Sequence, residues 1–126
     1  MSVRNSVDLV TEALANLGVL AAGQPIDPED FAYVNEKLDA IFRKLAALEI
    51  CYIPDPTSIN AEWFSDLADI VAGECATKFG SEPGMIAALV AKGLGSRPPG
   101  SGDAAMSLRQ IARSRPTGEV VRAEYM

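Results

Sequence analysis

Residues 27–49 read DPEDFAYVNEKLDAIFRKLAALE, and we expect the rest of the chain to be organised around this stretch. Asp27 is a suitable N-cap, because its carboxylate can accept hydrogen bonds from the free amides of a first helical turn. Pro28 fits the first helical position, where no amide hydrogen is needed. The stretch predicts a helix about 33 Å long, at about 1.5 Å per residue. Its apolar residues recur at steps of three and four, which marks one face that the other helices must cover: Phe31, Val34, Leu38, Ile41, Leu45 and Leu48.

Four further helices are predicted around this one. The first begins at Asn5 or Ser6 and ends before Gly18, and the third covers residues 60–79. A weaker fourth helix opens at 81–83, and the last covers residues 103–114. The inward residues are expected to be Val7, Val10, Leu14 and Leu17; Phe64, Leu67, Ile70, Val71, Cys75 and Phe79; Ile86, Leu89 and Val90; and Ala104, Leu108, Ile111 and Ala112. The outward face of the third helix is expected to hold Glu62, Asp66, Asp69, Gly73 and Thr77.

Three segments are not expected to be helical. Two prolines keep residues 50–56 extended, so that this apolar loop could form a short edge strand. Glycines and prolines make 93–102 an irregular loop. The last residues read as an extended arm that is too short to fold alone. The predicted fold is therefore all-α, a small bundle of four to five helices over residues 1–114, followed by an extended C-terminal arm over residues 115–126.

Composition limits the chemistry that this chain could perform. The chain has 126 residues, enough for one domain, and no run of apolar residues long enough for a membrane span. It contains no histidine, which removes the commonest general base and the commonest metal ligand. Its two cysteines are 24 positions apart and are expected to be thiols. We therefore expect no metal, no cofactor and no enzymatic activity.

Charge is distributed unevenly along the chain. Residues 1–82 carry 14 acidic and 5 basic side chains, whereas residues 83–126 carry 3 acidic and 6 basic ones. This asymmetry suggests that the C-terminal third meets something different from what the acidic body meets; the alternative is a solvated basic tail with no partner. Two alternative functions remain open at this point. One is a carboxylate-dependent cell-wall hydrolase acting at infection, and the other is a small regulatory protein that binds nucleic acid through its C-terminal arginines.

Three stretches together resemble one family. They are DLVTEAL with NLGVL at residues 8–20, LDAIF at 38–42, and LAD with ATKFG at 67–80. Over residues 5–80 the chain is similar to the head-to-tail adaptors of tailed bacteriophages, also called head completion or packaged-DNA stabilisation proteins, and within them to tail accessory factors. SLRQIAR at 107–113, followed by a proline and an extended end, is a looser likeness.

The resemblance implies a structural protein of the virion, at the head-tail junction after assembly in the host cytoplasm. Such a protein binds beneath the portal ring, closes the DNA-filled head and offers a platform to a tail or nozzle protein. It would join copies of itself in a cyclic ring, expected to be a dodecamer, through which DNA passes without sequence-specific binding. No membrane contact is implied. The residues expected to bind the portal are Arg113, Arg115, Val120, Val121, Arg122, Tyr125 and Met126, and those expected to face the channel are Glu62, Asp66 and Asp69.

Overall fold

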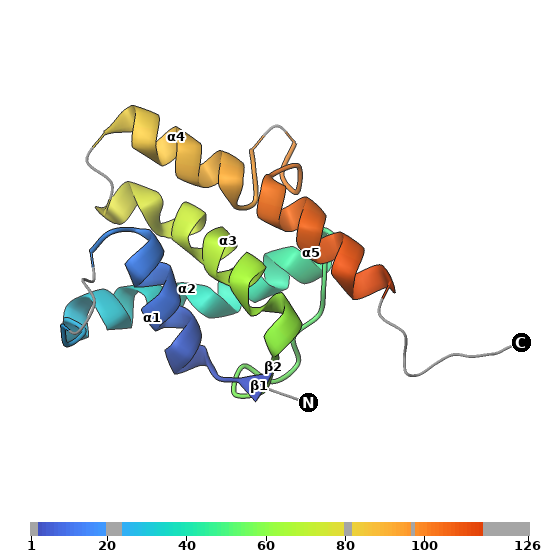
Figure 1. Ribbon diagram of the computed structural model, residues 1–126, viewed down its shortest axis with the longest axis horizontal. Helices are drawn as coiled ribbons and strands as arrows, with labels where there is room; N and C mark the ends of the chain where they lie inside the picture. Colours follow the sequence, from blue (N-terminus) through green and yellow to red (C-terminus); the bar gives the residue numbers. More distant parts are fainter. Residues whose placement is uncertain (1–2, 20–23, 80–81, 97, 115–126) are drawn as a thin grey trace, which may run out of the picture.

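The computed structural model describes residues 3–19, 24–79, 82–96 and 98–114. These residues form five α-helices and two very short strands (Figure 1). The prediction of an all-α bundle is confirmed. The C-terminal arm, residues 115–126, lies outside the described residues. The elements are β1 (Val3–Arg4), α1 (Ser6–Asn16), α2 (Pro28–Ala47), β2 (Ile59–Asn60), α3 (Ala61–Phe79), α4 (Pro83–Lys92) and α5 (Asp103–Ser114).

The helix ends form where the sequence predicts them. Asn5 caps α1 through a reciprocal pair of bonds, in which the Asp8 amide donates to Asn5 Oδ1 at 2.9 Å. Asp27 caps α2, its Oδ1 accepting from the Glu29 amide at 2.9 Å. Gly18 follows α1 with a φ of 80°, the left-handed conformation that a helix stop requires. Local sequence chemistry therefore sets these boundaries.

The central element is α3 rather than α2. It contacts each of the other four helices, and Figure 1 shows it running through the middle of the molecule. The expectation that the bundle is organised around α2 is wrong. Small buried residues on α3, including Ala68, Ala72 and Ala76, let neighbouring helices approach it from several sides. Its larger residues, Leu67, Ile70 and Val71, supply the centre of the core.

The predicted outward face of α3 is wrong at Gly73. This residue is buried against α4, and a Cβ atom built on it would lie 2.7 Å from the backbone oxygen of Leu89. Real Cβ atoms essentially never come that close to such an atom. Glycine is therefore the residue that lets α3 and α4 pack with their backbones nearly in contact.

Two other predictions are also corrected. Val7, expected on the inward stripe of α1, is 50% exposed, whereas Leu9 is completely buried. The loop at 50–56 forms no strand; instead β1 pairs with β2 in antiparallel register, Val3 opposite Asn60. This pairing ties the start of α1 to the start of α3. None of the described helices combines the length and apolar character needed to cross a membrane.

Candidate functional site

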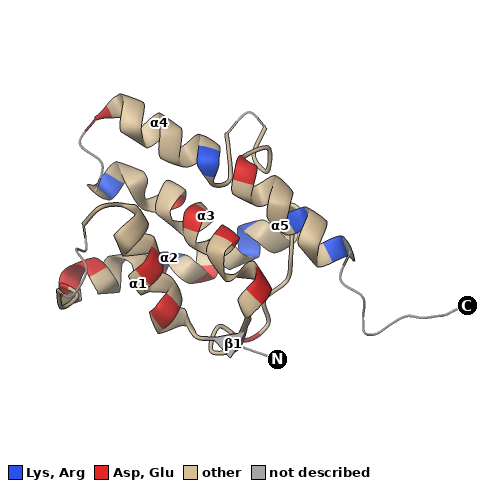
Figure 2. Cartoon of the chain, in the orientation of Figure 1, with Lys and Arg blue, Asp and Glu red and all other residues tan. Residues whose placement is uncertain are grey.

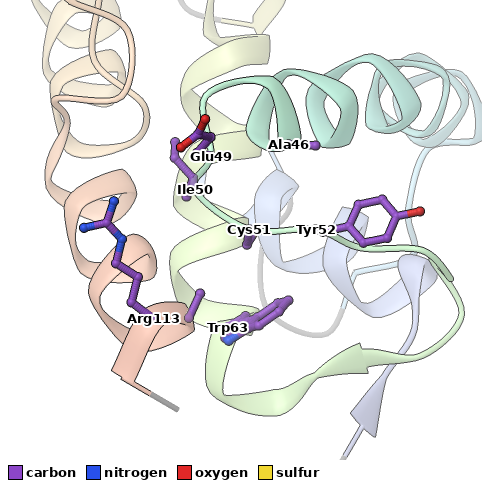
Figure 3. Close-up of a pocket in the computed structure, with 8 residues that line it drawn as sticks. Ala46, Glu49, Ile50, Cys51, Tyr52, Trp63 and Arg113 are labelled. Atoms are coloured by element: carbon purple, nitrogen blue, oxygen red, sulfur yellow. The ribbon is translucent and has the colours of Figure 1, made fainter.

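An open hollow on the described surface lies where α2, α3 and α5 meet (Figure 3). Its volume is about 530 Å³, within the range of about 300–1,000 Å³ that is usual for binding pockets. Three separate segments line it, so that it exists only in the folded chain. The lining residues are Ala46, Glu49, Ile50, Cys51, Tyr52, Trp63, Ala112 and Arg113.

One wall of the pocket comes from the abrupt end of α2. The Ile50 amide donates to the Leu45 carbonyl at 2.9 Å and the Glu49 amide to the Ala46 carbonyl at 3.0 Å. This pair of bonds is a Schellman motif, which turns the chain sharply out of the helix. Glu49 occupies its left-handed position with a φ of 58°, where glycine is usual. The turn directs residues 50–52 along the pocket.

The segment after this turn combines a buried thiol with an exposed aromatic ring. Burial raises the pKa of Cys51 to about 11, so its thiol stays protonated and weakly nucleophilic near neutral pH. Tyr52 is 70% exposed although it is a large aromatic residue. The pocket therefore offers an apolar and aromatic surface rather than a reactive nucleophile.

Trp63, near the start of α3, forms part of the pocket floor. Its indole Nε1 is buried and has no hydrogen-bond partner among the described residues. Figure 3 shows this nitrogen on the side of the ring that faces the last turn of α5. An unsatisfied buried donor costs about 1–3 kcal/mol.

The last wall belongs to α5 and carries its positive charge. Arg109 Nη2 donates to the Leu48 carbonyl at 3.4 Å, joining α5 to the end of α2. Arg113, one turn later, is exposed at the pocket rim. Figure 2 shows basic residues along α5, while acidic residues gather over α1 and α3. Arg113 is thus placed to meet a ligand or partner at this site.

Of the predicted portal-binding residues, only Arg113 lies in the described part of the chain. The other six, at positions 115–126, fall outside it: Arg115, Val120, Val121, Arg122, Tyr125 and Met126. Arg113 lines the pocket together with residues that the sequence analysis did not single out, above all Tyr52 and Trp63. Trp63 is the sole tryptophan of the chain, and Tyr52 lies two residues before a proline. These two features are the only ones in the sequence that could have marked Trp63 and Tyr52 as pocket residues.

The three residues predicted to face a channel differ in their surroundings. Glu62 is exposed and Asp66 is half-buried. Asp69 lies between helices, where its Oδ1 accepts from Asn16 Nδ2 at 3.1 Å and lies 3.9 Å from Lys92 Nζ. The expectation that Asp69 belongs to an open outward face is therefore wrong, because Asn16 of α1 and Lys92 of α4 both lie beside its carboxylate. Whether any of the three faces a channel stays a prediction.

Desolvation raises the pKa of Asp69 above its ordinary value. Lys92 opposes the shift, whereas the carboxylates of Asp66 and Glu12 add to it. Asp69 therefore lies at the junction of α1, α3 and α4 and does not line the pocket where α2, α3 and α5 meet. No group of three or more potential ligands is placed to hold a metal ion within the described residues.

Comparison of the chain with protein-family models, curated proteins and solved structures found no match. The lining of the pocket includes one carboxylate, that of Glu49, whereas glycoside hydrolysis uses a pair flanking the scissile bond. The pocket gives no support to the hydrolase alternative.

Proposed function

We propose that this chain is a structural protein of a tailed bacteriophage, a head-to-tail adaptor that binds beneath the portal ring. It closes the DNA-filled head and gives the tail or nozzle protein its attachment platform. The proposal starts from the sequence resemblance over residues 5–80, which implies a small helical bundle. The observed five-helix bundle agrees with the small helical bundle that the resemblance implies, and this agreement is the observation that supports the proposal.

The distribution of charge supports two unlike partner surfaces on one subunit. Acidic side chains gather over α1 and α3 (Figure 2), whereas Arg109 and Arg113 make the second half of α5 basic. A cyclic ring joins different patches of identical subunits, so it needs such asymmetry. An acidic surface also suits a conduit for DNA, since like charge discourages adhesion of phosphates.

In this proposal the basic end of the domain and the C-terminal arm bind the portal. Val120, Val121, Tyr125 and Met126 provide apolar contacts, and Arg113, Arg115 and Arg122 pair with carboxylates of the portal. A buried valine or aromatic side chain contributes about 1.5–3 kcal/mol. Losing several of these contacts together should therefore abolish binding.

The decisive experiment mixes the purified chain with purified phage portal rings and examines the product by sedimentation and electron microscopy. We expect the chain alone to sediment as a monomer and to form a cyclic layer on the portal. A chain ending at Thr117 should keep its helical circular dichroism and fail to join the portal. Wild-type chain that never binds portal rings would refute the proposal. A truncated chain that binds normally would place the anchor in the helical body instead.

A further inference from the structure

We propose that a lysine groove between α2 and α3 docks on the acidic face of a second copy of this chain, in a head-to-tail contact. The charged and polar residues that line the groove are Tyr33, Lys37, Lys44, Glu74 and Thr77. The acidic face consists of Glu12 on α1 and of Glu62 and Asp66 on α3. The inference rests on the proposed function for its place in a ring, but the contact itself requires no portal.

The groove gathers three of the four lysines of the chain. Lys37 and Lys44 line it, its volume is about 360 Å³, and Lys78 lies over the ring of Tyr33 in its lining. Lys44 pairs with Glu74 at 3.0 Å. Among the described residues, neither Lys37 nor Lys78 has a carboxylate oxygen within 4.0 Å of its ammonium group. Two cations of the groove are therefore available to a partner.

Tyr33 holds these two cations in place. Its ring meets that of Phe79 edge-on, with centroids 5.8 Å apart and an angle of 87° between the planes. The ammonium groups of Lys37 and Lys78 lie 5.3 and 5.4 Å from the centroid of the Tyr33 ring. The negative face of an aromatic ring attracts cations at this distance. Both lysines should therefore lose less conformational freedom on binding than unrestrained surface lysines do.

The complementary surface belongs to the same chain. Glu12 and Glu62 are exposed and Asp66 is half-buried, and Figure 2 shows acidic residues gathered over α1 and α3. The carboxylates of Asp66 and Glu12 contribute to the raised pKa of Asp69, so these groups lie close enough to repel one another. Positive charge brought by a second copy would relieve this repulsion.

The two surfaces lie on different sides of the subunit. Asp66 and Lys78 are twelve positions apart on α3, which places them about 120° apart around the helix axis at about 3.6 residues per turn. One subunit can therefore offer its lysine groove to one neighbour and its acidic face to another. A contact between unlike patches of identical chains is head-to-tail, and it closes into a ring when the rotation between neighbours permits.

A second copy is favoured over nucleic acid as the occupant. Carboxylates border the groove, namely Glu74 inside it and Glu29, Asp30 and Glu36 in the adjoining hollow that Lys78 lines. They would repel a continuous row of phosphates, whereas a second copy brings only a few carboxylates, placed opposite the two lysines. Exposed ion pairs are individually weak. Isolated chains should therefore stay monomeric at micromolar concentration and associate at millimolar concentration or on a portal.

Carbodiimide cross-linking tests the contact, because it joins a lysine amine to a carboxylate only where the two groups touch. The experiment mixes equal amounts of unlabelled and ¹⁵N-labelled full-length chain at millimolar concentration and low salt, without portal. Mass spectrometry distinguishes links between two copies, which give peptide pairs of mixed isotope content, from links within one copy. Lys44 and Glu74 are the internal control, since their ion pair lies within one chain and should give pairs of a single isotope content.

We expect mixed pairs that join Lys37 or Lys78 to the acidic face, with a yield that falls at least about tenfold at about 1 M salt. The absence of mixed pairs, or mixed pairs formed by Lys92 instead, would overturn the proposal. Loss of the mixed pairs on addition of a short DNA duplex would also overturn it, because nucleic acid would then occupy the groove. Failure of the chain to bind portal rings would leave the cross-linking result unchanged, so the two proposals can fail separately.

A charge exchange checks the same contact by light scattering. Lys37→Glu/Lys78→Glu and Glu62→Lys/Asp66→Lys should each remain monomeric at millimolar concentration, because both surfaces of each variant then carry the same sign. Their equimolar mixture should associate, since every surface again meets its opposite. Circular dichroism verifies that both variants keep their helices. A mixture that stays monomeric, or association of Glu62→Lys/Asp66→Lys alone through its lower net charge, would contradict the assignment of these surfaces.

Discussion

Replacement of Gly73 by alanine tests the close contact between α3 and α4. The added Cβ would lie 2.7 Å from the Leu89 carbonyl oxygen and 3.3 Å from the Cα atom of Val90. Both neighbours are backbone atoms, which cannot rotate away as a flexible side chain can. The two helices must therefore separate for the methyl group to fit.

The magnitude follows from two opposing terms. Overpacking costs about 1–3 kcal/mol, and a contact with rigid backbone belongs to the upper half of that range. Alanine is favoured over glycine inside a helix by about 1 kcal/mol. The expected result is a net loss of about 1–2 kcal/mol in the free energy of unfolding. This loss would be measured from the urea midpoint at constant slope.

Gly84→Ala is the matched control. Gly84 lies in the first turn of α4, and a Cβ built there meets nothing within 4 Å. The same chemical change should there raise stability by up to about 1 kcal/mol, mainly by restricting the unfolded chain. The two substitutions are thus expected to have opposite signs.

Hydrogen exchange would show where the strain of Gly73→Ala is relieved. No residue of α4 is fully buried, so α4 is the helix that can most easily move away. Its amides should lose protection while those of α1 and α2 keep theirs. A Gly73→Ala chain that is as stable as wild type, with α4 still protected, would refute the reasoning.

Three other substitutions or treatments test separate features. Glu49→Gly should stabilise the chain by about 0.5–1 kcal/mol in urea unfolding, because relief of a left-handed conformation, about 1–2 kcal/mol, exceeds the entropy cost of glycine; an unchanged or lower midpoint would contradict this. Because the pKa of Asp69 is raised on folding, the native state binds more protons, so its contribution to stability falls as pH rises from the ordinary value of 3.8 through the folded pKa. Asp69→Asn should therefore gain urea stability over wild type as pH rises through that window, and a constant difference would disprove the assignment. Burial raises the pKa of Cys51 and Cys75 to about 11 each, so neither should react with a thiol reagent in the native chain near neutral pH, and both should react after unfolding; fast native reaction would show that a thiol is exposed.

The helix boundaries could be predicted because they depend on neighbouring residues alone. Asn5 and Asp27 cap helices through atoms two or three residues away, and Gly18 stops one by its own conformation. The apolar stripe of α2 could be recognised in the sequence because one side of that helix faces the core and the other faces water. Four of its six predicted residues, Val34, Leu38, Ile41 and Leu45, are buried.

The central position of α3 could not be predicted in the same way. A helix covered on several sides has no clear polar face, so its periodicity is weak where its burial is greatest. Gly73 looks like an outward position on a helical projection, and only the approach of α4 explains it. The pocket has the same difficulty, because residues 46–52, Trp63 and the end of α5 are far apart in the sequence.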